Sequence, residues 1–271
     1  MEIALGFVIS IFIGLTGVGA GSMTTPLLIL LLGLPASEAV GTALIFGAVV
    51  KILTTPMYIA RRQVDWRALM FLLATGLPGV LAGSLLFRGI RTSVVAAAVG
   101  ATIVSIALLN LFRFSKVTRR DRKAWLMLVG LPIGAEVGFS SAGAGALGAL
   151  SLMSLTTLVP AAVVGTDLAF GLVLSVIGGG IHAAMGDLNA AVLIKLLIGG
   201  VVGSLAGAML SSRLPSQKLR FALCLMLVAL GLQLTYTSVN RVITENAQRR
   251  SAPVEGTTSM QVVAPVASQP R

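Results

Sequence analysis

Five ionisable side chains stand inside long apolar stretches, where charge is unfavourable. One of them, Lys195 in AVLIKLLIGG, lies about one turn from the start of its stretch, so the alternative for it is to snorkel to the interface. Lys51 lies in FGAVVKILTTP, Asp167 in VGTDLAF, Glu136 in LPIGAEVGF and His182 in GGGIHAAMG. A charge at the centre of a bilayer costs at least about 2.5 kcal/mol on insertion scales, so each is a functional candidate. We expect Lys51 to attract an anion or pair with an acid. Asp167, Glu136 and His182 are candidates for proton coupling, with a structural role as the alternative for each.

Two short runs rich in Gly, Ser and Thr interrupt the apolar sequence, GVGAGSMTTP at 17–26 and FSSAGAGALG at 139–148. Gly and Pro disfavour helix, so both runs predict breaks. In transporters, the positive helix N-termini at such breaks hold anions. We predict that a helical limb begins near Pro26, with Thr24 or Thr25 as its cap. The alternative is that the glycines serve only close helix packing.

The composition restricts the chain to one class, an integral membrane protein. Of its 271 residues, 56% are hydrophobic and 11% are charged, whereas soluble domains are about 25% charged. The apolar stretches are too long for barrel strands of roughly 10 residues. The single cysteine excludes an intrachain disulfide. The net charge of +11 fits Lys and Arg in cytoplasmic loops better than a nucleic-acid partner.

The chain repeats itself at an offset of 124 residues. Residues 17–90 align with 141–214 without a gap, at 23 identities in 74 positions. A composition this biased gives about 10% identity by chance, so two homologous halves are predicted. Thr42 and Thr166 stand at equivalent places in two VGT motifs. Their hydroxyls are predicted either to bind a ligand or to bond a carbonyl one turn back.

The predicted organisation is two repeats, at 1–112 and 124–240, joined by a basic cytoplasmic linker at 113–123 and followed by a disordered tail at 241–271. Each repeat has one broken region, at 3–34 or 124–156, and three apolar stretches long enough to span a bilayer. The six predicted spans are 38–60, 68–87, 93–112, 160–186, 188–210 and 219–239.

The loop charges predict that the repeats are inverted. The loop at 61–67 carries three arginines, whereas its counterpart at 185–191 carries only Asp187. Inversion needs an odd number of crossings per repeat, so each broken region is predicted to be a re-entrant hairpin beside three transmembrane helices. Twelve Lys and Arg side chains then lie in cytoplasmic loops and both termini lie outside. The alternative has eight full crossings with both termini inside.

The stretch GLTGVGAGSMTTPLLILLLGLPASEAVGTALIFG resembles the N-terminal signature of the TauE/SafE family of membrane permeases. The segment from VVGTDLAF to RLPSQKLR is similar to the family's second half, and the resemblance covers about residues 1–240. It implies two inverted repeats with hairpins that enter the membrane without crossing it. It also implies transport of sulfite, sulfonates or other small organic anions. The binding residues carried over by position are Gly19, Gly21, Thr24, Thr25, Thr42, Ser141, Gly143, Gly145 and Thr166, to which we add Lys51.

The chain departs from the family pattern in three respects. The first run has Gly-Ala-Gly where many members have three glycines, and the second-half limb lacks the usual proline. Ala43 and Asp167 stand where many members have Ser. The substrate is therefore expected to differ from those of better-known members.

These features predict an all-α integral membrane protein of a bacterial-type inner membrane. We expect a secondary transporter of small anions that works by alternating access, with proton coupling as an option. The expected partners are a small anionic substrate, the lipid bilayer and, as an option, a second copy. No catalytic residue, cofactor or metal is expected. The alternatives are a passive anion channel and an intramembrane enzyme, the latter disfavoured because the chain has one His and no HExxH motif.

Overall fold

The structure is a computed structural model that describes residues 1–16, 20–86, 122–141 and 143–210, with single positions within 101–108 and 228–240. These residues form helices and their connections, and no strand occurs among them. The predicted spans at 93–112 and 219–239 lie mostly outside the described residues, as does the linker. The predicted tail at 241–271 and Gly19 lie wholly outside them.

Four long helices, α3, α4, α8 and α9, are apolar and long enough to cross a membrane. Four shorter ones, α1, α2, α6 and α7, have 13 or 15 residues. At 1.5 Å per residue these reach about 20–22 Å, less than the roughly 30 Å of a hydrocarbon core. The order is α1 (Glu2–Thr16), α2 (Ala20–Leu32), α3 (Ala36–Ala60), α4 (Trp66–Leu86), the 3-10 turn η2 (Lys123–Trp125), α6 (Leu126–Ser140), α7 (Gly143–Leu155), α8 (Pro160–Ala184) and α9 (Ala190–Leu210).

The helix boundaries repeat at the same offset as the sequence. Adding 124 to the bounds of α1, α3 and α4 gives the bounds of α6, α8 and α9. The predicted spans at 38–60, 68–87, 160–186 and 188–210 match α3, α4, α8 and α9 to within two residues at each end. An apolar stretch of fixed length, bounded by charged or Pro-containing loops, leaves little freedom in where such a helix ends.

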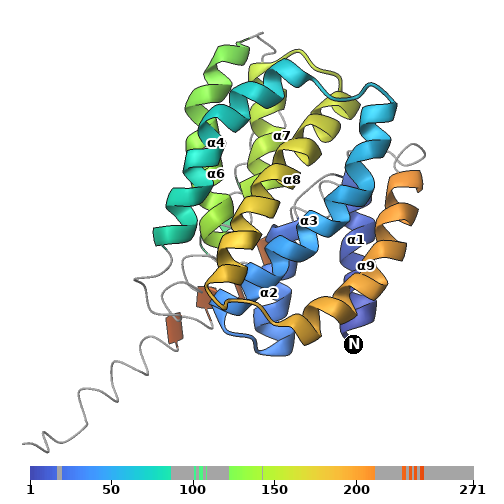
Figure 1. Cartoon of the computed structure of the whole chain (residues 1–271), viewed down its shortest axis with the longest axis vertical. Coiled ribbons are helices and arrows are strands. Elements are labelled where there is room, and N and C mark those ends of the chain that lie inside the picture. Colours follow the sequence, from blue (N-terminus) through green and yellow to red (C-terminus); the bar gives the residue numbers. More distant parts are fainter. Residues whose placement is uncertain are drawn as a thin grey trace, which may run out of the picture.

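Each short first helix packs against a long helix of the other half. Figure 1 shows α4 beside α6 on one side, α1 beside α9 on the other, and α3 and α8 between them. Small residues allow the close approach. A Cβ at Gly83 on α4 would overlap the Ala135 carbonyl, and a Cβ at Gly207 on α9 would overlap the Ile11 carbonyl. The two contacts are equivalent, because adding 124 to Gly83 gives Gly207 and adding 124 to Ile11 gives Ala135.

The central helices α3 and α8 run antiparallel. Gly41, near the start of α3, lies against Asp187, just beyond the end of α8. Gly165, near the start of α8, lies against Gln63, just beyond the end of α3. These two helices, which occupy equivalent places in the two halves, therefore point in opposite directions.

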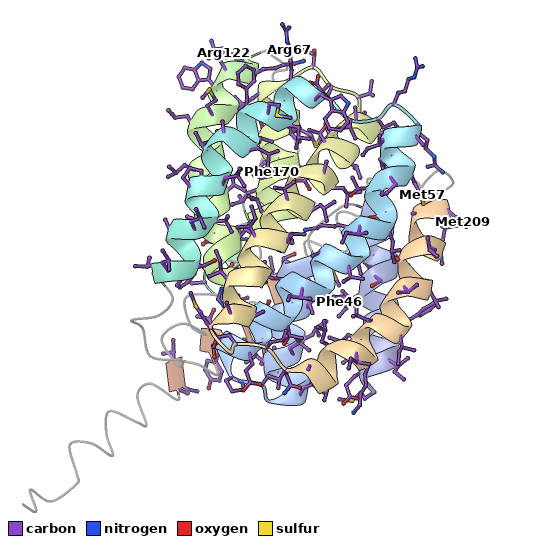
Figure 2. All side chains as sticks on the ribbon, viewed as in Figure 1. Phe46, Met57, Arg67, Arg122, Phe170 and Met209 are labelled. Carbon is purple, nitrogen blue, oxygen red and sulfur yellow. The ribbon has the colours of Figure 1, made fainter. Side chains whose placement is uncertain are left out.

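The outer helices present apolar side chains on their exposed faces, as a surface in contact with lipid requires. The interior is closed by large side chains, among them the equivalent residues Phe46 and Phe170 (Figure 2), each fully buried against a glycine of the neighbouring helix. The exposed apolar side chains include Phe7, Met70, Leu81, Leu85, Leu128, Leu131, Ile194, Ile198, Val202 and Met209.

The prediction that a limb begins near Pro26 is wrong. Helix α2 includes Ala20, and Pro26 is its seventh residue, so Thr24 and Thr25 lie within the helix and cap nothing. Pro removes one backbone hydrogen bond, but membrane helices tolerate this loss when neighbouring groups satisfy the freed carbonyl. Helices α3, α4 and α6 also contain an internal proline.

Candidate functional site

Lys51 lies at the point where α3 and α8 cross. It is residue 16 of the 25 in α3, and its side chain is only 3% exposed. Its Nζ donates a 3.0 Å hydrogen bond to the Oγ of Ser175, which is residue 16 of the 25 in α8. Lys51 therefore touches its own counterpart in the other half. The two equivalent residues thus meet where the antiparallel helices α3 and α8 cross.

Asp167 joins α8 to α7. The consecutive short helices α1–α2 and α6–α7 are called the first and second hairpins here. Asp167 is 1% exposed, and its Oδ1 accepts a 3.3 Å hydrogen bond from the backbone N–H of Gly145 on α7. Gly145 has a φ of +105°, a conformation that favours glycine, and a Cβ at Gly148 would overlap the same carboxylate oxygen. The Asp167 carboxylate also lies within electrostatic reach of the Lys51 ammonium. A buried acid and a buried base thus occupy one region.

The two hairpins meet in the interior. The hydroxyls of Thr25 on α2 and Ser141 at the end of α6 are 2.6 Å apart, and a Cβ at Gly21 would overlap the Ser141 carbonyl. Ser141 has a left-handed φ of +63°, which ends α6. The Thr24 hydroxyl is fully buried and has no hydrogen-bond partner among the described residues. Gly143 begins α7 on the other side of this junction.

Thr42 and Thr166 each accept a backbone hydrogen bond from the other half. The N–H of Asn189 donates to Thr42 at 3.1 Å, and the N–H of Asp65 donates to Thr166 at 2.9 Å. Asn189 and Asp65 are themselves equivalent residues, each directly before a long helix. The two hydroxyls therefore hold the α8–α9 and α3–α4 connections in place. Their predicted contact with substrate stays a prediction.

The other two coupling candidates lie on or against α6. Glu136 accepts a hydrogen bond from the hydroxyl of Ser140, one turn later on α6. His182, fully buried near the end of α8, has its Nε2 3.0 Å from the carbonyl oxygen of Gly138 and its Nδ1 3.5 Å from the Asp187 carboxylate. His182 thus connects α8, α6 and the α8–α9 connection, far along α8 from Asp167.

Two contacts were not predicted from the sequence, Lys51 with Ser175 and Lys123 with Asp65. Ser175 would have been found by adding 124 to Lys51, because the repeat pairs the two positions. The ion pair of 2.7 Å between Lys123 and Asp65 had no sequence signal, since 58 residues separate them. Burial raises the pKa of Asp65, but hydrogen bonds from Lys123 and from the N–H of Ala68 outweigh that effect, so this pKa lies below its usual value.

A family profile described as Sulfite exporter TauE/SafE matches residues 2–234. The chain belongs to this family. A curated relative in Bacillus subtilis (strain 168), the "Probable membrane transporter protein YjnA", is 28% identical over 249 residues, covering 86% of this chain and 98% of the relative. No solved structure matches the chain. This TauE/SafE protein is thus a multi-pass membrane transporter and not an enzyme.

Proposed function

We propose that this TauE/SafE protein is a secondary transporter of a small anion in a bacterial inner membrane. The proposed substrates are sulfite, an organosulfonate or a related organic anion, moved by alternating access. The observation that carries the proposal is the position of Lys51, a buried cation at the crossing of two long apolar helices. A lysine there is unfavourable unless an anion or an acid repays its desolvation.

The proposed architecture is a pair of inverted repeats related by an axis in the membrane plane. The antiparallel α3 and α8 and the exchanged Thr42 and Thr166 contacts support it. An in-plane axis runs through the middle of the bilayer, so Lys51 and Ser175, which touch across it, would lie at mid-depth. Substrate sites of transporters built from inverted repeats lie at that depth.

The proposed orientation places the α3–α4 connection in the cytoplasm. Arg67 and Arg122 lie at the same end of the molecule (Figure 2), together with Arg61, Arg62 and Lys123. The α8–α9 connection, at the other end of α8, carries Asp187 and no cation. An excess of Lys and Arg marks cytoplasmic loops, so the basic end is assigned to the cytoplasm and the hairpins enter from opposite sides.

The proposed ligands come from both hairpins and both central helices. The ammonium of Lys51 supplies charge, and the hydroxyls of Thr24, Thr25 and Ser141 supply hydrogen-bond donors. A buried hydroxyl such as that of Thr24, which lacks a partner among the described residues, is stabilised when a ligand accepts its hydrogen bond. The remaining proposed ligands are Gly19, Gly21, Thr42, Gly143, Gly145 and Thr166.

The test is uptake into proteoliposomes, screened over sulfite, sulfoacetate, taurine and simple carboxylates. Lys51→Met is compared with Lys195→Met, a matched control, because Lys195 is exposed and pairs with Glu2 near the surface. We expect Lys51→Met to reduce uptake of the preferred anion at least about tenfold and Lys195→Met to leave it near wild type. Equal uptake by the two variants would contradict the proposed site. Fast flux that no gradient concentrates would indicate a passive channel instead.

A further inference from the structure

We infer that the site takes a monovalent anion together with one proton, and that the Asp167 carboxylate holds this proton. The inference rests on the proposed function and specifies the charge of its substrate and its coupling ion. The hydrogen bond of Lys51 goes to the neutral hydroxyl of Ser175, not to the Asp167 carboxylate.

In this arrangement an anion can replace Asp167 as the countercharge of Lys51 without first breaking a direct hydrogen bond between the two residues. Ser175 accepts from the ammonium at 3.0 Å and keeps its own hydroxyl proton, which can be donated to a bound oxyanion. A direct ion pair would have to be broken before an anion could bind. An ammonium held by a neutral hydroxyl needs no such step, and its remaining donors are available to the anion.

The charge count then gives the stoichiometry. With Lys51 protonated and Asp167 ionised, the pair sums to zero. A monovalent anion alone would bring the buried site to −1, which a low-dielectric interior strongly disfavours. One proton on the Asp167 carboxylate restores zero. A divalent anion would leave −1 even after that proton is added, so it is excluded.

The proton also has a mechanical consequence. The ionised carboxylate accepts the backbone N–H of Gly145, at the start of α7. Hydrogen bonds to a charged acceptor are roughly twice as strong as neutral ones, so protonation weakens the hold of α8 on the second hairpin. The proton enters from water on the loading side as the anion binds, and it leaves from the same oxygen on the other side. Binding of the pair thus loosens an element that alternating access must move.

Other titratable groups near α8 are engaged elsewhere. Asp65, beside Thr166, pairs with Lys123, and Glu136 on α6 accepts from Ser140. His182 lies beside Asp187 at the opposite end of α8. Of the four acids Asp65, Glu136, Asp167 and Asp187, Asp167 is the one that interacts electrostatically with Lys51. The remaining titratable side chains on the described helices packed against α8 are Glu38 and Tyr58 on α3 and Arg67 on α4.

The test uses two probes of similar shape and different charge, methanesulfonate and sulfate, in proteoliposomes with an imposed pH gradient. We expect wild-type protein to accumulate methanesulfonate toward the alkaline side, with one proton per anion reported by an internal pH dye. We expect no effect of membrane potential and at least tenfold less sulfate uptake. Sulfate uptake equal to that of methanesulfonate, or a proton-to-anion ratio of zero, would overturn the inference. This part needs no variant and so does not depend on the folding of one.

The second part asks which residue holds the proton. Asp167→Asn should keep methanesulfonate exchange across the membrane within a few fold of wild type and should lose gradient-driven accumulation. Asp65→Asn, a carboxylate in the α3–α4 connection, is the matched control and should keep both. Accumulation by Asp167→Asn at the wild-type level would overturn the assignment. If wild-type protein moves none of the screened anions, the proposed function itself fails, which is a separate result.

Discussion

The two halves of this transporter share a backbone and differ in chemistry. The boundaries of α1, α3 and α4 recur at an offset of 124. So do the glycine contacts that join α1 to α9 and α6 to α4, and the paired hydrogen bonds of Thr42 and Thr166. The buried charges do not recur, because Lys51 faces Ser175 and Asp167 corresponds to Ala43. The repeat therefore holds where backbones pack, and the two halves differ at Lys51 and Asp167, the buried charges of the proposed site.

The difference extends to the ends of the central helices. His182 and Asp187 at the end of α8 correspond to Tyr58 and Gln63 at the end of α3. Pro26 on α2 corresponds to Leu150 on α7. A symmetric frame with two unlike halves is what a transporter needs if it presents one site to two sides in turn.

The largest effect is expected from exchanging Lys51 and Ser175, which contact each other across the proposed axis. Lys51→Ser should reduce anion transport about 100-fold, because a charged hydrogen-bond donor is lost from a buried site. Adding Ser175→Lys to that variant should restore transport to within about tenfold of wild type, since the new lysine faces the same point from the other helix. Initial rates of uptake in proteoliposomes measure both. No recovery in the double variant would show that the two positions are not interchangeable.

The glycine contacts should respond equally in the two halves. Gly83→Ala and Gly207→Ala should each destabilise the fold by about 1–3 kcal/mol, because the new Cβ meets a backbone carbonyl that has no room to move. Gly180→Ala is the control, since nothing lies within 4 Å of a Cβ there. Thermal unfolding in detergent compares the three variants. Clearly unequal effects of the first two would weaken the equivalence of α1–α9 and α6–α4 packing.

The paired threonines provide a finer comparison. Thr42→Val and Thr166→Val should each cost about 1–2 kcal/mol of stability, since each leaves a backbone N–H without its acceptor. The Ser variants keep the hydroxyl and should stay close to wild type. The same unfolding measurement applies. If transport falls much further than stability in either Val variant, that threonine also binds substrate.

The smallest effect is expected from Asp65→Asn. This variant places an asparagine in the first half at the position equivalent to Asn189 in the second half. The pKa of Asp65 is lowered in the folded protein, so its stabilising contribution is present above the unfolded value and is lost as pH falls through the folded one. The variant should therefore lose less than about 1 kcal/mol at pH 7 and be less sensitive to acid below about pH 4. Unfolding followed from pH 7 to pH 3 tests this. An unchanged acid response would contradict the role of the Lys123 pair.

Much of the fold could be predicted because membrane thickness and the repeat both act on the sequence directly. The ends of α3, α4, α8 and α9 followed from apolar length, and the two Gly-rich runs contain Thr25 and Ser141, whose hydroxyls meet in the interior. The prediction that the helical limb begins near Pro26 was wrong, because helix propensities measured in water overstate the effect of a proline in an apolar interior.

The site was less accessible to sequence reasoning. Lys51 and Asp167 stood out as charges in apolar stretches, but the contact of Lys51 with Ser175 depends on how α3 crosses α8. The use of Thr42 and Thr166 to hold the opposite loops likewise needs the tertiary arrangement. Neither relation has a local pattern. Both sets of contacts can be predicted once the repeat offset of 124 residues is combined with the antiparallel packing of α3 against α8.

The central claim is that equivalent loops of the two halves lie on opposite sides of the membrane. Arg62 and Gly186 are equivalent, exposed turn residues with φ of +56° and +83°, and Arg62 shows that this turn accepts a side chain. Single cysteines at Arg62 and Gly186, with Cys224→Ser, can be labelled by a membrane-impermeant maleimide in vesicles of known orientation. We expect labelling of Arg62→Cys only from the cytoplasmic side and of Gly186→Cys only from outside. Labelling of both from the same side would contradict the claim.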